Sequence, residues 1–318
     1  MTEPLSAEEE RDRPRLAASG PVKVRVPAKI NLHLGVGPLR RDGYHEVTTV
    51  YHAVSLFDEL TARRGDTLSL TMEGEGAGSL PLDESNLVLR AARALARHTG
   101  RPAHARLHLR KQIPLAAGLA GGSADGAAAL VACDALWGTG LGRDELAAVA
   151  GEIGSDVPFL VYGGTALGTG RGVAVSPVLA RAANWHWVLA LAGGGLSTPA
   201  VYAELDRMRA TRGAPEPLGS TDALLGALRQ RDPNVLARTL GNDLQAAAVS
   251  LRPELADTLR VGDGVDALAG IVSGSGPTCV FLARDATHAA RIATALEAAG
   301  VCRRAVIAHG PVAGARVN

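Results

Sequence analysis

Apolar and polar residues alternate along several segments in the first third of the chain. Between residues 103 and 109, Ala and Leu take every second position, and His and Arg take the positions between them. This period of two is typical of a strand with one buried face. Similar patterns predict strands over 22–26, 30–36, 48–56 and 67–72, with loops over 37–45 and 73–82.

Apolar residues at helical spacing predict helices in both halves of the chain. In 86–98, Leu87, Leu89, Ala91 and Leu95 are interspersed with Arg residues, and Gly100 suits the end of a helix. Further helices are predicted over 124–137, 143–152 and 286–299, with three or four more between 199 and 259. Later strands are predicted over 185–192, 268–272, 279–283 and 305–308. Strands mixed with segregated helices favour an α+β fold over a doubly wound sheet.

The length of the chain and a pause in its pattern predict two domains. A chain of 318 residues is long enough for two, since domains typically hold about 100–200 residues. The periodic pattern stops around 177–184 and then resumes as a strand. We therefore predict domains over 21–181 and 182–318, preceded by a disordered tail over 1–20 in which acidic and basic residues mix.

Charge and cysteine content exclude several classes of protein. The 33 Lys and Arg nearly balance the 32 Asp and Glu, so the chain lacks the basic field of a nucleic-acid-binding or membrane-surface protein. No apolar run reaches the length of a membrane span, and the N-terminus has no signal-peptide core. The three Cys lie far apart and form neither a disulfide framework nor a zinc ribbon. These features predict a cytoplasmic protein without nucleic-acid or membrane partners.

Many of the 38 glycines gather between regular elements, above all in the segment 114–124 between a predicted strand and a predicted helix. Small residues let a ligand approach the backbone, and a helix N-terminus attracts anions. This glycine-rich loop therefore predicts a di- or triphosphate site, with Ser123 able to bind a phosphate or a metal. The alternatives are a flexible linker, or a helix that Ser123 simply caps. The loop lacks the Gly-Lys-Ser/Thr of a Walker A motif.

Two charged residues in short motifs are candidates for chemistry. In the predicted strand after Pro27, Lys29, Asn31 and His33 share one face, either at a site or on an ordinary solvent-exposed surface. Asp156 precedes Val-Pro, which predicts an N-cap residue. Its carboxylate could also orient or deprotonate a hydroxyl group, and both interpretations can hold together.

Two further loops have a structural and a functional interpretation each. The segment 273–278, Ser-Gly-Ser-Gly-Pro-Thr, is either a tight hairpin or a second small-residue loop that faces phosphates. Tyr44 and His45 follow Asp-Gly and lie either on a surface turn or at a site where the aromatic ring stacks on a ligand. Aromatic residues make up only 3% of the chain, which favours the second interpretation of Tyr44.

Three segments in this order, PAKINLHLGV, PLAAGLAGGSADGAAAL and SGSGPT, resemble the GHMP kinase superfamily of small-molecule kinases, which includes galactokinase, homoserine kinase and mevalonate kinase. PAKINL, RRDGYHEV and GSDVPF are most similar to those members that act on a cytidine diphosphate-linked polyol in isoprenoid precursor biosynthesis. The resemblance covers roughly residues 22–310, and several ordered motifs are more specific than any one alone.

The resemblance implies a two-domain α+β GHMP kinase fold, with a ribosomal protein S5 domain 2-like N-terminal domain and a ferredoxin-like C-terminal domain. It implies an ATP:alcohol phosphotransferase that phosphorylates a 2-hydroxyl group and acts as a monomer or homodimer. The ATP-binding domain would be 21–181. Mg²⁺ would be held by the ATP phosphates, with Ser123 as a candidate ligand.

The resemblance also assigns residues to roles. Lys29 and Asp156 match positions that the superfamily uses for catalysis, and Asn31, Tyr44, His45 and Thr198 match positions at the substrate. Tyr44 and His45 would hold the cytosine by stacking and hydrogen bonds. The ATP phosphates would lie on the backbone of Pro114, Leu115, Ala116, Ala117, Gly118, Leu119, Ala120, Gly121, Gly122, Ser123 and Ala124.

The chain departs from the superfamily's glycine pattern at Ala116, Ala117 and Ala120, and alanine disfavours positive φ. Two alternatives to the cytidine-linked kinase stay open. One is another kinase of the same superfamily, such as homoserine or mevalonate kinase. The other is a non-catalytic binding protein on the same fold, which predicts a lost Lys29 or Asp156, although both are present.

Overall fold

The structure is a computed structural model that describes residues 18–178, 184–210 and 216–318. The predicted disordered tail lies outside the described residues except for 18–20, which precede the first strand without regular structure. The predicted domain boundary near 181 also lies outside them, so the division at that residue stays a prediction. Among the helices of the described segments, none is long and apolar enough to cross a membrane.

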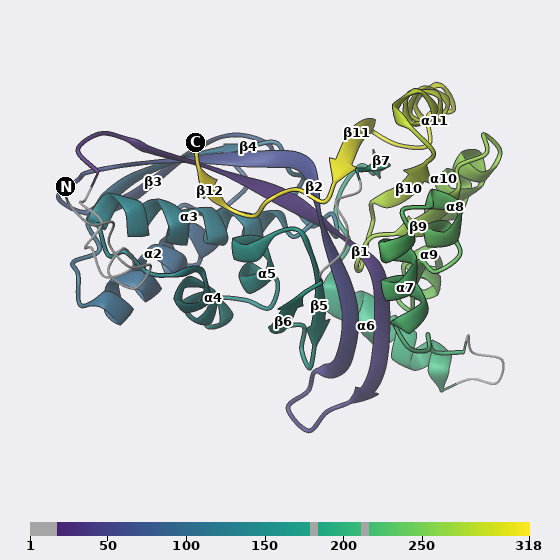
Figure 1. Ribbon diagram of the computed structural model, residues 1–318, viewed down its shortest axis with the longest axis horizontal. Helices are drawn as coiled ribbons and strands as arrows, with labels where there is room; N and C mark the ends of the chain where they lie inside the picture. Colours follow the sequence, from purple (N-terminus) through teal and green to yellow (C-terminus); the bar gives the residue numbers. More distant parts are fainter. Residues whose placement is uncertain (1–17, 179–183, 211–215) are drawn as a thin grey trace, which may run out of the picture.

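The first sheet is built on a long antiparallel pair, β1 (Val22–Leu39) and β2 (His45–Arg63). Its strand order is β12-β1-β2-β4-β3, and β3 and β4 are parallel. The remaining strands of this path are β3 (Leu68–Gly74), β4 (Ala105–Lys111) and β12 (Arg316–Val317). The chain therefore returns to the first sheet at its C-terminal end (Figure 1).

Four helices cover one face of the first sheet (Figure 1). They are α2 (Leu87–Thr99), α3 (Gly121–Trp137), α4 (Arg143–Gly151) and α5 (Val157–Tyr162). Helix α3 is central and buried on most sides, because its many Ala and Gly residues let β1, β2 and α2 pack closely against it. As a result, the N-terminus of α3 is fixed at the edge of the domain where the glycine-rich loop ends.

The second sheet is antiparallel, with the order β11-β7-β10-β9. Its strands are β7 (Trp185–Leu191), β9 (Ala269–Val272), β10 (Cys279–Ala283) and β11 (Arg304–Gly310). The helices of this half are α6 (Thr198–Arg209), α7 (Asp222–Gln230), α8 (Pro233–Ala237), α9 (Gln245–Leu251), α10 (Glu254–Asp263) and α11 (Ala286–Ala298). The α+β class is confirmed.

Both faces of the second sheet are buried, which β7 shows by its alternation. Trp187 and Leu189 join the core shared with the first sheet, whereas Val188 and Ala190 join a core formed with α6, α9, α10 and α11. Strand β11 packs against β2. The two sheets are therefore joined by a continuous apolar core rather than by a linker alone.

The structure corrects several predicted boundaries. The strands predicted over 22–26 and 30–36 are one strand, with a register shift between Pro27 and Ala28. Proline has no N–H to donate, so the pairing is interrupted but the strand continues. The loop predicted over 37–45 is shorter, because β1 continues to Leu39. Strands β5 (Thr165–Thr169), β6 (Ala174–Pro177), β8 (Gly241–Asn242) and β12 were not predicted, because they are too short to show a period of two.

A buried ion network anchors both ends of the glycine-rich loop. The Nζ of Lys111, at the end of β4, lies 2.6 Å from Asp58 Oδ2 in β2 and 2.6 Å from Asp125 Oδ2 in α3. The other oxygen of Asp58 accepts the backbone N–H groups of Gln112 and Ile113, which lead into the loop. Burial lowers the pKa of Lys111, but the two carboxylates outweigh it and raise this pKa overall, while burial raises the pKa of Asp125 well above its usual range.

Replacing Lys111 by Met removes the cation and leaves two buried carboxylates. We expect the free energy of unfolding to fall by about 3–5 kcal/mol near neutral pH. The deficit should shrink as the pH falls, because burial raises the pKa of Asp125 in the folded state and this carboxylate then regains its proton. Urea unfolding at several pH values measures this, with the exposed Lys23→Met as the control. An equal loss in Lys23→Met would contradict the assignment.

Candidate active site

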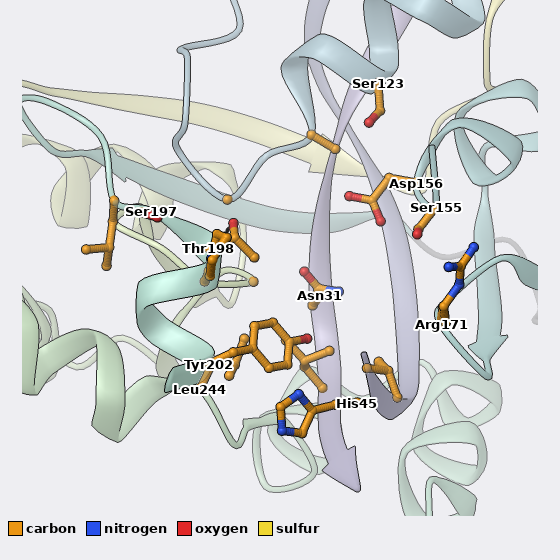
Figure 2. Close-up of a pocket in the computed structure, with 18 of the residues that line it drawn as sticks. Asn31, His45, Ser123, Ser155, Asp156, Arg171, Ser197, Thr198, Tyr202 and Leu244 are labelled. Atoms are coloured by element: carbon orange, nitrogen blue, oxygen red, sulfur yellow. Dashed lines mark hydrogen bonds between the residues drawn. The ribbon is translucent and has the colours of Figure 1, made fainter. Parts of the chain in front are cut away.

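A cavity of about 900 Å³ opens between the two sheets. Its wall comes from β1, the turn after it, the glycine-rich loop, the start of α5 and the start of α6. Figure 2 shows Ser123, Ser155 and Asp156 at one end, His45 and Tyr202 at the other, and Asn31 between them. The motifs that lie far apart in the sequence therefore line one cavity.

Lys29 lies in the wall of this cavity and is only 5% exposed. Its ammonium donates to Asn31 Oδ1 at 2.7 Å and to the Gly118 carbonyl at 3.1 Å, and lies 3.8 Å from Asp156 Oδ2. Burial lowers the pKa of Lys29, and the charge of Asp156 opposes that shift. The interpretation of this strand face as an ordinary solvent-exposed surface is therefore wrong, because the Lys29 ammonium is buried among oxygen atoms of β1, the glycine-rich loop and the start of α5.

Asn31 shares the face of Lys29, as the alternation predicts, but His33 does not. The register of β1 and β2 shifts between Asn31 and His33, so that Leu34 lines the cavity in place of His33. The Nδ2 of Asn31 donates to the Thr49 hydroxyl on β2, and that hydroxyl donates to the His33 carbonyl. Asn31 is therefore held in one orientation, with its Oδ1 toward Lys29. His33 is buried but is not among the residues that line the cavity.

Asp156 occupies the N-cap position of α5, but its side chain makes no capping hydrogen bond. Its Oδ1 instead accepts a 2.9 Å hydrogen bond from the Tyr51 hydroxyl, and its Oδ2 faces Lys29. A carboxylate that does not cap its own helix is available for a ligand, which supports the functional interpretation of this motif.

The glycine-rich loop lines the cavity through seven of its eleven predicted residues: Ala116, Ala117, Gly118, Ala120, Gly121, Gly122 and Ser123. Four do not line it: Pro114, Leu115, Leu119 and Ala124. Helix α3 begins at Gly121 with Ala120 as its N-cap, so the alternative in which Ser123 caps this helix is wrong. A linker is also excluded, because Ala116 and Leu119 accept backbone hydrogen bonds from Leu196 and Lys29.

Two alanines of the loop adopt the backbone conformation that favours glycine. Ala116 has a φ of 46° and Ala120 a φ of 57°. A left-handed residue with a Cβ costs about 1–2 kcal/mol. Ala117 does not have positive φ, so alanine in place of glycine strains two of the three positions. The loop keeps its shape at this cost because neighbouring backbone hydrogen bonds hold it.

The segment 273–278 connects β9 and β10 and also supports the glycine-rich loop. The Ser273 hydroxyl donates to the Gly118 carbonyl at 3.0 Å, and the Thr278 N–H donates to the Ala117 carbonyl. Ser275 shares a 2.8 Å hydrogen bond with Thr198 at the start of α6. The hairpin turn is therefore confirmed, and Gly274 and Ser275 also line the cavity. That this turn faces phosphates stays a prediction.

The far end of the cavity is aromatic. The ring of His45 stacks on Tyr202 with centroids 5.0 Å apart, and its Nε2 lies 2.9 Å from Asp206 Oδ1. Tyr44 is 57% exposed at the mouth of the cavity, and the Arg171 guanidinium lies 4.7 Å from its ring centroid. This end presents flat rings and polar groups, and it lies across the cavity from the glycine-rich loop.

Comparison with known proteins agrees with this geometry. The GHMP kinases N terminal domain model matches residues 86–164, and the GHMP kinases C terminal model matches residues 224–302. A 4-diphosphocytidyl-2-C-methyl-D-erythritol kinase from Salinispora tropica is 74% identical over 318 residues and covers 100% of both chains. The chain belongs to the GHMP kinase family.

Two solved structures place the fold within this family. A 4-(cytidine 5'-diphospho)-2C-methyl-D-erythritol kinase has a TM-score of 0.73 at 32% identity, with 90% of this chain and 98% of the other covered. The homoserine kinase from Cytophaga hutchinsonii has the same TM-score of 0.73 at 20% identity, covering 95% and 98%. The second likeness shows only the shared GHMP kinase fold.

Several residues of this GHMP kinase cavity were not predicted from the sequence. Ser155 lies within the GSDVPF motif, Arg171 lies outside the quoted motifs, and Tyr202 and Asp206 come from α6, whose sequence shows no motif. The spacing of Tyr202 and Asp206 by four residues places them on one helical face, which is the signal that could have found them. Tyr51 was predicted only as part of a strand.

The described residues include no group of three or more His, Cys, Asp or Glu that could hold a metal ion. A magnesium ion at this site would therefore depend on oxygens of a bound phosphate. Mg²⁺ commonly binds in this way, with few protein ligands and several waters. Ser123, in the first turn of α3, and Asp156 have side-chain oxygens at the same end of the cavity (Figure 2) and are the candidate protein ligands.

The contact between the two loops can be tested at Gly118. Its φ is +76°, and an added Cβ would lie 2.0 Å from the Ser273 carbonyl oxygen. We expect Gly118→Ala to raise the KM for ATP at least tenfold and to lower the free energy of unfolding by about 2 kcal/mol or more, through both strain and the clash. The control is Gly78→Ala, where φ is +85° but no atom lies within 4 Å. It should show the strain alone, with an unchanged KM; equal effects in both variants would contradict this account.

Proposed function

We propose that this GHMP kinase transfers the γ-phosphoryl group of ATP to the 2-hydroxyl of 4-diphosphocytidyl-2-C-methyl-D-erythritol, which yields the 2-phosphate and ADP. The observation that carries the proposal is the Lys29–Asp156 pair. It lies beside the glycine-rich loop, in a cavity whose other end is aromatic. The name of the relative that is 74% identical over its full length supports the choice of substrate.

The glycine-rich loop is the proposed site for the ATP phosphates. The N-terminus of α3 presents unpaired N–H groups and the positive end of the helix dipole toward the cavity. Backbone groups can neutralise a triphosphate here although the protein's net charge is only +1. Bound Mg²⁺ would supply further charge neutralisation, with Ser123 as its candidate protein ligand.

Lys29 and Asp156 are the proposed catalytic residues. Asp156 lines the cavity with its Oδ2 3.8 Å from the Lys29 ammonium, and there it would accept or orient the proton of the attacking hydroxyl. Lys29 would stabilise the charge that develops near this oxygen. Its hydrogen bonds to Asn31 and Gly118 fix the ammonium in place before substrate binds, so little reorganisation is needed. No residue in this scheme forms a covalent intermediate.

The aromatic end is the proposed cytidine site. Tyr44 and His45 retain the roles that the sequence predicts, stacking and hydrogen bonding to cytosine, and Tyr202 adds a second ring. Asp206 holds the His45 ring by its Nε2, which orients the other ring nitrogen. Asn31 and Thr198 would contact the polyol between the two ends.

A substrate panel separates this proposal from the alternatives. With Mg²⁺ and ATP, ADP release should be fast with 4-diphosphocytidyl-2-C-methyl-D-erythritol and at least a thousandfold slower, in kcat/KM, with homoserine or mevalonate. The reason is that homoserine and mevalonate both lack the cytidine that the aromatic end would bind. Preference for homoserine or mevalonate would support another GHMP kinase, and no ADP release with any of the three would support a binding protein.

Asp156→Asn tests the proposed proton acceptor. Loss of a general base typically costs about 10²–10⁴-fold in rate, so kcat should fall by that order while ATP still binds with its wild-type Kd. The matched control is Asp144→Asn on α4, a carboxylate that likewise accepts from a tyrosine hydroxyl but lies outside the cavity. Wild-type turnover in Asp156→Asn would remove Asp156 from the mechanism.

A further inference from the structure

Tyr51 lies on β2 beneath the Lys29–Asp156 pair and is only 4% exposed. Its hydroxyl lies 2.9 Å from Asp156 Oδ1, and the ammonium of Lys29 lies 5.9 Å from its ring centroid. Neither the sequence motifs nor the catalytic scheme above uses this residue. It is nevertheless the described side chain that donates a hydrogen bond to the carboxylate of Asp156.

The ring of Tyr51 is fixed from several sides. It stacks on Phe159 of α5, one turn after Asp156, with centroids 4.9 Å apart and an interplanar angle of 25°. A Cβ at Gly168 would lie 2.6 Å from the ring, and a Cβ at Gly172 would lie 2.5 Å from the hydroxyl. The β5–β6 hairpin therefore packs closely around Tyr51 and leaves its hydroxyl group space beside the Asp156 carboxylate.

The hydroxyl of Tyr51 is protonated at neutral pH and therefore donates the hydrogen bond to Asp156. Burial raises the pKa of Tyr51 well above its usual value, and the charge of Asp156 raises it further. Its other described acceptor, the Gly172 carbonyl, lies 3.5 Å away, so the carboxylate is the better partner. With Oδ1 engaged, rotation of the carboxylate is restricted and Oδ2 stays toward Lys29.

We infer that Tyr51 is the positioning residue of this active site, which holds the Asp156 carboxylate by Oδ1 so that Oδ2 is presented to the attacking hydroxyl group. This inference rests on the proposed role of Asp156. It implies that the hydroxyl group fixes the geometry of the carboxylate for proton transfer. Tyr51 does not touch the substrate in this account, so its loss should act on kcat rather than on binding.

Other titratable groups also face Asp156, and a test must separate them from Tyr51. Lys29 faces it from β1, and Tyr202 lies across the cavity on α6, where burial and then the charge of Asp156 raise its pKa to about 12. Arg171 lines the same cavity from the β5–β6 turn. None of them changes when only the hydroxyl of Tyr51 is removed.

Tyr51→Phe removes this hydroxyl and keeps the ring. We expect kcat to fall about five- to twentyfold, with KM for ATP and for the cytidine substrate within twofold of wild type. The split between a lower kcat and unchanged KM values separates positioning of the carboxylate from a general loss of structure. The matched control is Tyr162→Phe, which removes a hydroxyl that donates to Asp144 outside the cavity. It should leave kcat and both KM values unchanged.

A second pair of variants moves the hydroxyl without removing it. In Gly172→Ala the new Cβ would push on the Tyr51 hydroxyl, whereas in Gly170→Ala of the same turn it meets no atom within 4 Å. Both glycines have positive φ, 84° and 70°, so backbone strain is common to the two. Only Gly172→Ala should reproduce the lower kcat with unchanged KM values. This comparison decides the question even if Tyr51→Phe is unstable.

A double-mutant cycle distinguishes failure of this inference from failure of the proposed function. In the Asp156→Asn background, Tyr51→Phe should cause no further loss of kcat, because the group that it positions is gone. An unchanged kcat in Tyr51→Phe, or an equal loss in the Asp156→Asn background, would overturn the positioning role. Full activity of Asp156→Asn itself would instead overturn the proposed function.

Discussion

The burial of one cation, Lys29, is the constraint on which the site depends. A buried ammonium is costly unless oxygens surround it. Here those oxygens come from β1 itself, from the glycine-rich loop and from the start of α5, as Asn31, Gly118 and Asp156. Each of these elements must therefore reach the same point. The cation links the part of the cavity suited to phosphate to the carboxylate proposed to handle the proton.

Three further sets of contacts hold the elements around Lys29 in place, and each set is of a different kind. The Lys111 network holds the strand and the helix on either side of the glycine-rich loop. The segment 273–278 brings backbone and hydroxyl donors from the second sheet to the same loop. Tyr51 holds the carboxylate from below. Because the two sheets share one apolar core, the loops that they carry are fixed relative to each other.

The elements that the sequence predicts well are those with a strong period. Helix α2 was predicted over 86–98 and spans Leu87–Thr99, ending at Gly100 in the left-handed conformation. Strand β10 has the predicted bounds, Cys279–Ala283. The misses are local: Pro27 suggested a break where the strand only shifts register, and the short strands β5 and β6 have too few apolar residues for a period. The α+β class followed from the order of these elements alone.

The sequence by itself determined the family and pointed to the residues that are now proposed for the chemistry, because motifs such as PAKINL and GSDVPF are local and keep their residue types in order. Only the tertiary structure decided that Lys29 is buried, that Asp156 does not cap its helix, and that Tyr51, Tyr202 and Asp206 lie in the same cavity. These facts depend on contacts between residues up to 161 positions apart, such as His45 and Asp206. No local pattern carries that information, since the packing of the two sheets sets which side chains meet.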